Sequence, residues 1–270
     1  MKYFITGGCG FIGVNLALSL GKKKYKDILV IDNLSKITAN KNLSILKKKN
    51  ISFKKIDIGK SKQKIEKLIK QHKPKVIFHL AGQVAMSTSL KNPDLDFQGN
   101  VLSTINLLES IRKFSKQTIL IFSSTNKVYG DLNDFNYSIK KTRFSIKGNF
   151  NGFSENNNLD FKSPYACSKG SADQYVLDYA RVFNLNTIVF RHSSVYGGRQ
   201  FFTYDQGWVG WFCAQAIKHK LIKKTKFSIT GNGKQVRDLV HIDDITKLYK
   251  LSFKNFKKLK GKAYNIGGGI

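Results

Sequence analysis

The residues Gly7-Gly8-Cys9-Gly10-Phe11-Ile12-Gly13 form a glycine-rich turn between an apolar run at 2–6 and a helical pattern at 11–20. A strand, glycines at this spacing and a helix together are typical of the first half of a dinucleotide-binding unit. In such a unit Gly7 permits the tight turn, Gly10 lets a pyrophosphate approach the backbone, and Gly13 lets helix and strand pack closely. The N-terminus of the helix stabilises the phosphate charge. The turn therefore predicts a dinucleotide site at the end of the first strand.

Apolar strand-like runs alternate with helical patterns through the first two-thirds of the 270 residues. This alternation predicts an α/β fold, a Rossmann-like doubly wound parallel sheet with helices on both faces. We expect a dinucleotide-binding domain over 1–192 and a smaller, partial substrate-binding lobe over 193–270, interleaved with it. The expected strands lie near 2–6, 28–32, 51–57, 75–80, 117–123, 186–191 and 226–230, and the expected helices near 11–20, 61–72, 94–114, 164–183, 207–220 and 242–252.

The formal net charge of +30 is the unusual feature of the composition. Such a charge favours nucleic acid or another anionic partner when it is concentrated in a stripe with aromatic residues. Here 6 of the 47 basic residues are Arg, and the Lys residues are spread along the chain. We therefore interpret the charge as solvated surface, expect no nucleic-acid partner, and expect part of the charge to attract a diphosphate substrate.

The three cysteines are widely separated and form no CxxC pair. This spacing favours reduced thiols and gives no indication of a zinc or other metal site. The chain starts without a charged leader and has no apolar run of about 18 residues, so we expect a cytoplasmic protein that does not cross a membrane.

Acidic residues follow the second and third predicted strands. Asp32 lies about 20 residues after the glycine turn, where a carboxylate accepts hydrogen bonds from ribose hydroxyls and repels a 2′-phosphate. This position favours NAD over NADP, although Lys36 lies close enough in sequence to soften the repulsion. Asp57-Ile58 and Leu80-Ala81 end the third and fourth strands at the edge where open α/β sheets bind ligands. For Asp57 a helix cap is an equally good interpretation.

The candidate catalytic residues are a tyrosine, a lysine and a threonine. Ser163-Pro164-Tyr165 is typical of a helix start, and Lys169 follows four residues later on the same face. We expect the ammonium group of Lys169 to stabilise the phenolate of Tyr165 and lower its pKa, so that Tyr165 removes a proton from a sugar hydroxyl. Thr125 ends the fifth strand and should bind the same sugar oxygen.

The glycine turn, the Thr125-to-Gly130 segment and the Tyr165/Lys169 pair together resemble the extended short-chain dehydrogenase/reductase family of nucleotide-sugar epimerases and dehydratases. Within that family, the stretches 79–86, 124–131 and 204–211 are most similar to the 2-epimerases of CDP-linked deoxyhexoses. The resemblance extends through the whole chain. It implies a bound NAD, transient oxidation of C2 of a CDP-linked dideoxyhexose to a 2-keto sugar, and re-reduction on the other face.

The resemblance also implies roles for individual residues. The implied catalytic residues are Thr125, Tyr165 and Lys169. The implied NAD contacts are Gly7, Gly10, Phe11, Ile12, Gly13, Asp32, Asn33, Asp57, Ile58, Leu80, Ala81, Asn100, Tyr165 and Lys169. For the CDP-sugar we expect contacts from Thr125, His192, Asp205, Gln206, Trp208 and Arg237. Arg237 matches the family's phosphate-binding arginine, whose planar fork suits a diphosphate.

Other functions stay open at this point. A UDP-hexose 4-epimerase shares the chemistry, because the seating of the sugar selects the carbon that reacts. A 4,6-dehydratase needs an Asp-Glu pair after the threonine, whereas this chain has Asn126-Lys127. An inactive NAD-binding fragment or a basic nucleic-acid-binding relative could lose Tyr165 or Lys169 without penalty, and both are present.

The long segment from Asn126 to Phe161 is a candidate substrate flap, because loops of this length are usually functional. In the family, further substrate-lobe helices follow the motif at 264–270. We therefore expect the C-terminal lobe of this chain to be incomplete, and we expect a homo-oligomer, a dimer or a tetramer.

Overall fold

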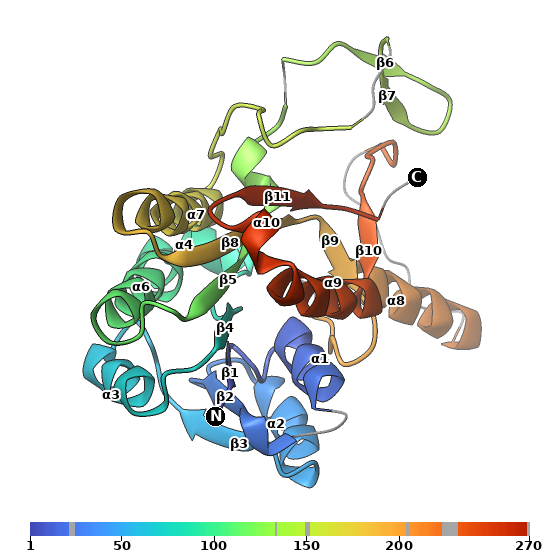
Figure 1. The fold of residues 1–270 in the computed structure, drawn as a ribbon. Coiled ribbons are helices and arrows are strands. Elements are labelled where there is room, and N and C mark those ends of the chain that lie inside the picture. Colours follow the sequence, from blue (N-terminus) through green and yellow to red (C-terminus); the bar gives the residue numbers. More distant parts are fainter. Residues whose placement is uncertain (22–24, 133, 149–151, 204–205, 223–231, 269–270) are drawn as a thin grey trace.

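The computed structural model describes residues 1–270 except 22–24, 133, 149–151, 204–205, 223–231 and 269–270. Its centre is a seven-stranded parallel sheet in the order β3-β2-β1-β4-β5-β8-β11 (Figure 1). The strands are β1 (Tyr3–Thr6), β2 (Ile28–Asp32), β3 (Ser52–Lys55), β4 (Val76–His79), β5 (Ile119–Thr125), β8 (Asn186–His192) and β11 (Ala263–Ile266). The predicted doubly wound sheet is confirmed.

Helices cover both faces of the sheet (Figure 1). One face packs against α3 (Lys62–His72), α6 (Ser103–Phe114) and α7 (Pro164–Phe183), and the other against α1 (Phe11–Leu20), α2 (Ala39–Lys48) and α9 (Ile242–Lys254). Successive strand residues point to opposite faces of the sheet. Phe4 packs on the face covered by α3, α6 and α7, and Ile5 packs on the face covered by α1, α2 and α9. This period of two, with both faces apolar, is why the strands appear as continuous hydrophobic runs in the sequence.

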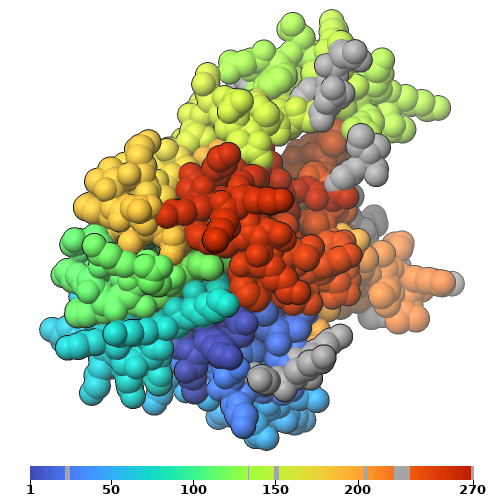
Figure 2. Space-filling model, in the orientation of Figure 1, coloured from blue at the N-terminus to red at the C-terminus, as the bar shows by residue number. Residues whose placement is uncertain are grey.

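The remaining elements lie at the carboxyl edge of the sheet or connect the helices. A run of short helices leads into α6: α4 (Met86–Lys91), α5 (Pro93–Asp96) and the π-helical η2 (Phe97–Leu102). The other elements are η1 (Tyr25–Asp27), η3 (Asn126–Tyr129), the antiparallel pair β6 (Tyr137–Ile139) and β7 (Phe144–Ile146), the parallel pair β9 (Ser194–Tyr196) and β10 (Leu239–His241), α8 (Trp208–Ile222) and α10 (Phe256–Leu259). The β6–β7 hairpin belongs to the long segment that we expected to be a flap, and it stands away from the sheet (Figures 1 and 2).

To the central sheet and the helices that cover it, the tertiary structure adds two elements that the alternation did not predict, α2 and the edge strand β11. β11 pairs with β8, and α9 packs beside α1, so parts of the chain after residue 192 complete the central sheet and its helical layer. The strand expected near 226–230 lies outside the described residues. Among the described helices, none is long and apolar enough to cross a membrane.

The strand order reverses between β1 and β4, the point at which open α/β sheets bind ligands beyond the carboxyl ends of their strands. The glycine turn follows β1, and Leu80-Ala81 follows β4. Thr125 ends β5, the next strand along the sheet. The fold thus places the predicted dinucleotide contacts and the predicted catalytic threonine along one edge.

Candidate active site

The glycine turn has the close backbone packing that its spacing predicts. Gly7 has a φ of +66°, and a Cβ on it would lie 2.6 Å from the backbone nitrogen of Ala81. A Cβ on Gly13 would overlap the carbonyl oxygen of Gly7 and lie 2.5 Å from the Cα of Gly8. A side chain at either position therefore requires the backbone to move. The packing brings the turn, the start of α1 and the end of β4 together.

Asp32 is joined to the glycine turn by hydrogen bonds. Its Oδ2 accepts the backbone N–H of Cys9 at 3.0 Å, and its Oδ1 accepts that of Leu34 at 2.8 Å. Each oxygen keeps a lone pair that can accept a ribose hydroxyl. Burial raises the pKa of Asp32, while these two hydrogen bonds and the charge of Lys36 lower it. Lys36 does therefore interact with the carboxylate, as its position in the sequence indicated.

Asn33 and Asp57 meet across the ends of β2 and β3. Asn33 Nδ2 donates to Asp57 Oδ2 at 3.0 Å, and Asp57 Oδ1 accepts the backbone N–H of Lys60 at 3.2 Å. Asp57 thus makes the local capping contact that was its alternative interpretation, while one side of its carboxylate faces Asn33. The neighbouring Ile58 is buried, and its carbonyl accepts Asn106 Nδ2 at 2.8 Å.

Asn100 is buried in η2 and fixed on one side only. Its Nδ2 donates to Ser168 Oγ at 2.9 Å and to the carbonyl of Gln83 at 3.1 Å. Among the described residues its Oδ1 has no hydrogen-bond partner, and it packs against the backbone at Gly82. A buried oxygen without a partner is costly unless a ligand supplies a donor. This oxygen, the glycine turn and the open lone pairs of Asp32 fit a dinucleotide.

A segment from the C-terminal third packs over the dinucleotide end of the site. Arg199 Nη1 donates to Asn15 Oδ1 of α1 at 2.7 Å, and Asn15 Nδ2 donates to the carbonyl of Gly198 at 2.9 Å. Gln206 Oε1 accepts Lys36 Nζ at 3.1 Å. Gln206, which we expected at the substrate, is therefore held beside the residues that surround Asp32.

The Thr125 side chain reaches Tyr165, whose pKa it lowers as a hydrogen-bonding neighbour. Ser163 caps α7 by accepting the backbone N–H of Ala166 at 3.1 Å, with Pro164 in the first turn, which places Tyr165 at the start of the helix. Thr125 Oγ1 also accepts the backbone N–H of Lys127 at 3.2 Å, so its hydroxyl hydrogen is free to donate to the phenol oxygen. The structure thus brings Thr125 and Tyr165 together, as we expected of two residues that bind the same sugar oxygen.

The pKa of Tyr165 differs from our expectation in direction. Burial raises the pKa of Tyr165 above its usual value, and the hydrogen bond with Thr125 lowers it less. Lys169 Nζ donates to the carbonyl of Ser123 and lies 4.2 Å from the centre of the Phe122 ring. Burial lowers the pKa of Lys169 to about 7, against the carboxylate of Asp173, which raises it. Thr125, not Lys169, is thus the group that lowers the pKa of Tyr165 in this geometry.

The predicted substrate residues fall in different surroundings. Arg237 is exposed, with Nη2 donating to Gln235 Oε1 at 3.0 Å. Burial lowers the pKa of Lys127, and the charge of Arg237 lowers it further. Two cations therefore meet beside the turn that follows Thr125, an arrangement that suits an anionic ligand. Trp208 begins α8 and is 38% exposed, and its ring contacts Phe212. Asp205 lies outside the described residues.

His192 is not on an open surface. It is 5% exposed, its Nε2 lies 3.0 Å from the hydroxyl oxygen of Tyr249 in α9, and the two rings stack. Burial lowers the pKa of His192 to about 3, and the Lys169 charge lowers it further. This placement favours a core-packing role over substrate contact, because the ring is enclosed between β8 and α9.

Sequence reasoning missed the residues behind the catalytic helix. Asp173 lies one turn beyond Lys169, and its carboxylate is held by Arg191 of β8. The spacing of four residues from Tyr165 to Lys169 continues to Asp173, and this was a signal for Asp173. Arg191 could be found only from the tertiary structure, because no local pattern pairs a residue at the end of β8 with one in the middle of α7.

The chain matches the family described as the NAD dependent epimerase/dehydratase family over residues 3–267. It is 53% identical over 271 residues to a CDP-paratose 2-epimerase of Salmonella typhi, covering 100% of this chain and 80% of that protein. It is 33% identical over 269 residues to a putative UDP-glucose 4-epimerase of Methanocaldococcus jannaschii, covering 98% and 76%.

Solved structures share the fold. A UDP-glucose 4-epimerase of Thermotoga maritima, solved with UDP-glucose, gives a TM-score of 0.77 at 30% identity, covering 99% of this chain and 77% of that one. A UDP-glucose 4-epimerase of Thermus thermophilus, in complex with NAD, gives a TM-score of 0.74 at 27% identity, covering 99% and 78%.

Proposed function

Because this chain belongs to the NAD dependent epimerase/dehydratase family, we propose that it epimerises CDP-paratose at C2, giving CDP-tyvelose. The observation that carries the chemistry is the approach of Thr125 to Tyr165, one helical turn from Lys169, at the sheet edge that holds the glycine turn. The choice of C2 and of a CDP-sugar is supported by the higher identity with the CDP-paratose 2-epimerase than with the 4-epimerase.

NAD is the cofactor, and when bound it accepts a hydride from the sugar and returns it. The residues that would hold it are the glycine turn, Asp32, Asn33 and Asn100. We assign Tyr165 the proton of the C2 hydroxyl: its phenolate accepts that proton as the carbonyl forms and gives it back as the alcohol is restored. Thr125 holds the same oxygen, and the ammonium form of Lys169 stabilises the phenolate.

The turn after Thr125 argues against elimination of water. A 4,6-dehydratase needs a carboxyl acid/base pair there, and Asn126 and Lys127 supply none. Lys127 and Arg237 instead present two positive charges, which we assign to the diphosphate of the substrate. Under this proposal residues 1–192 hold the dinucleotide and the reacting sugar, and Arg237 adds a substrate contact from the 193–270 part of the chain.

We also propose a cytoplasmic homo-oligomer. The cysteines described, Cys9, Cys167 and Cys213, are free thiols. Large exposed hydrophobic side chains lie on the short helices before α6, namely Leu90, Leu95 and Phe97, and at the end of α7, namely Val182 and Phe183. Apolar surface of this kind is typical of a contact between subunits. Light scattering on the purified protein measures the subunit number, and a monomer at all concentrations would contradict this assignment.

The test of the function is an NMR assay of the purified, NAD-containing protein with CDP-paratose and, separately, with UDP-glucose. We expect conversion of the CDP-sugar to its C2 epimer, and a loss of about 10³-fold or more in kcat for Tyr165→Phe. The matched control is Tyr175→Phe, which removes the hydroxyl of an exposed tyrosine on the same helix and should leave kcat unchanged. Turnover of UDP-glucose alone would replace the proposal with a 4-epimerase.

A further inference from the structure

A buried ion pair lies directly behind the catalytic lysine. Arg191, 4% exposed at the end of β8, donates from Nε to Asp173 Oδ2 and from Nη2 to Asp173 Oδ1, both at 2.9 Å. Asp173 is fully buried in α7, one helical turn beyond Lys169. A two-pronged contact fixes the plane and the position of a carboxylate, which a single hydrogen bond does not.

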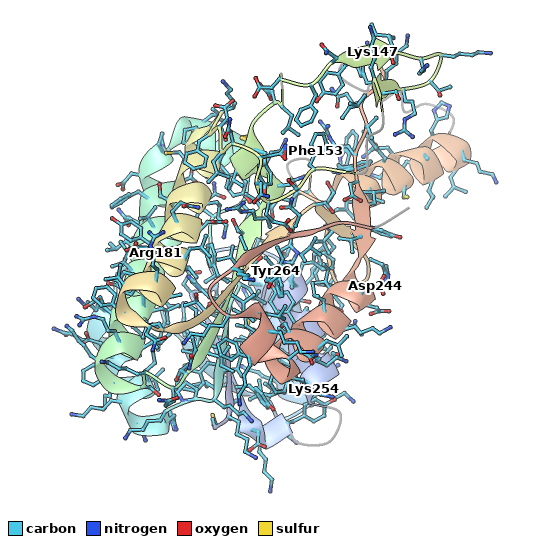
Figure 3. The ribbon with its side chains drawn as sticks, turned by 45° about the horizontal axis from the view of Figure 1, so that its top comes forward. Lys147, Phe153, Arg181, Asp244, Lys254 and Tyr264 are labelled. Atoms are coloured by element: carbon cyan, nitrogen blue, oxygen red, sulfur yellow. The ribbon has the colours of Figure 1, made fainter. Side chains whose placement is uncertain are left out.

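The same guanidinium continues the network away from the helix. Arg191 Nη1 donates to the hydroxyl of Tyr129 at 2.8 Å, and that hydroxyl donates to Asn265 Oδ1 of β11 at 2.7 Å. Asn265 Nδ2 donates to the carbonyl of Phe153 at 2.9 Å, and its backbone N–H donates to Glu155 Oε1 at 2.6 Å. Figure 3 shows Phe153 between Lys147 of the hairpin segment and Tyr264 of β11. A chain of hydrogen bonds thus connects the catalytic helix to the expected flap.

We propose that Asp173 and Arg191 are positioning residues for Lys169: Arg191 holds the carboxylate back, so that the ammonium group stays at the end of β5. Tyr129 and Asn265 tie this arrangement to the loop at 153–155. The inference rests on the proposed function, in which Lys169 supports the phenolate of Tyr165. Without Arg191, the carboxylate of Asp173 is free to bind the lysine one turn away and to draw Nζ from the carbonyl of Ser123.

Of the titratable groups around Lys169, Asp173 is the one whose charge raises the pKa of Lys169. His79 of β4 and His192 of β8 both interact with Lys169, and burial lowers the pKa of each to about 3, so both are neutral near pH 7. Tyr165 on α7 carries a raised pKa, and Asp96 of α5 interacts with Tyr165. Burial raises the pKa of Tyr249 of α9, and its neighbour Ser123 lowers it less. Asp173 is the group that raises the pKa of Lys169.

The experiment compares Asp173→Asn and Arg191→Lys with wild type in the NAD-containing protein. The pKa of Lys169 is measured by ¹⁵N NMR of lysine-labelled protein, with its Nζ resonance assigned by its loss in Lys169→Met. Asp173→Asn removes the opposite charge and should lower the pKa of Lys169 by about one unit or more. Arg191→Lys keeps a cation but cannot hold two oxygens in a plane, so it releases Asp173 and should raise that pKa.

The two variants therefore move one pKa in opposite directions, which a merely structural defect would not do. The matched control is Asp178→Asn, which breaks the exposed Asp178–Arg181 pair on the same helix and should leave the pKa of Lys169 unchanged; Figure 3 shows Arg181 on the outer side of α7. If Asp173→Asn does not fold, Arg191→Lys decides by itself. An unchanged pKa of Lys169 in the folded variants overturns the proposal.

Kinetics separate this proposal from the proposed function. With CDP-paratose, the alkaline limb of the kcat profile should move to lower pH in Asp173→Asn, because the required ammonium form is lost earlier. Tyr129→Phe should raise KM several-fold and leave the pKa of Lys169 in place, with Tyr175→Phe, at an exposed position of α7, as its control. An unchanged KM in Tyr129→Phe overturns the link to the loop. If wild type does not turn over the CDP-sugar, the proposed function fails, while the NMR titration still decides whether Asp173 and Arg191 position Lys169.

Discussion

The backbone N–H of Cys9 donates to Asp32 Oδ2 at 3.0 Å, which joins the glycine turn after β1 to the carboxylate after β2. The two parts of the predicted dinucleotide site are therefore one hydrogen-bonded unit. A change at Asp32 acts on the ribose contact and on the turn together.

We expect Asp32→Asn to weaken NAD binding by roughly 10- to 100-fold, the size of a lost hydrogen bond to a charged group. It should bind NADP better than wild type does, because the negative charge that repels a 2′-phosphate is gone and Lys36 remains. Isothermal titration of protein freed of cofactor measures both affinities. Asp27→Asn, at the opposite end of β2, is the control. Equal NAD affinity in Asp32→Asn and wild type would show that the ribose is bound elsewhere.

Gly13→Ala should destabilise the protein by about 1–3 kcal/mol, since its methyl group would overlap the backbone of Gly7 and Gly8. We expect a lower Tm and a reduced content of bound NAD. Gly198→Ala is the matched control, because a Cβ there meets no atom of the described residues within 4 Å and its φ lies outside the left-handed region. Thermal unfolding followed by circular dichroism compares the three proteins, and an equal Tm for Gly13→Ala and wild type would refute the packing argument.

Because His192 is buried, we expect the free energy of unfolding to fall as the pH is lowered below 6.5. The folded-state pKa is lowered from 6.5 to about 3, so between these values the unfolded chain binds a proton that the folded chain excludes. The stabilisation is therefore present above pH 6.5 and is lost as the pH falls, by about 1.4 kcal/mol per pH unit. His192→Phe keeps a ring against Tyr249 and should flatten the decline of the unfolding free energy between pH 6.5 and 5.

Urea unfolding at several pH values provides the measurement for His192→Phe. His219→Gln, at an exposed position of α8, serves as the control and should leave the pH dependence as in wild type. The same steep decline in His192→Phe and in wild type would assign the pH dependence to other groups, of which buried His79 is the first to examine.

Arg237→Gln should raise KM for the CDP-sugar by roughly 10- to 100-fold with little change in kcat, since a charge-assisted contact to the diphosphate is lost while the reacting carbon is untouched. Steady-state kinetics of the epimerisation test this expectation. Arg181→Gln, exposed on α7, is the control. A fall in kcat at constant KM would mean that Arg237 acts on the reacting part of the sugar instead.

The sequence predicted most of the central sheet, the glycine turn, Asp32 and the Tyr165/Lys169 pair. These features are local: each is a periodic apolar run, a turn or a helical spacing, and the chain's own geometry brings such residues together over a few positions. Thr125 is farther along the chain, but its place at a strand end fixed it at the carboxyl edge. The glycine turn and Asp32 already favoured NAD, and the family resemblance added the CDP-sugar substrate.

The edge strand β11, the burial of His192 and the position of Gln206 beside Lys36 came from the tertiary structure. So did the Asp173–Arg191 pair and its connection through Tyr129 to Asn265. Each of these depends on contacts between residues 18 to 170 positions apart, which a local pattern does not encode. The direction of the pKa shift at Tyr165 has the same origin, because desolvation depends on how many surrounding segments exclude water from the side chain.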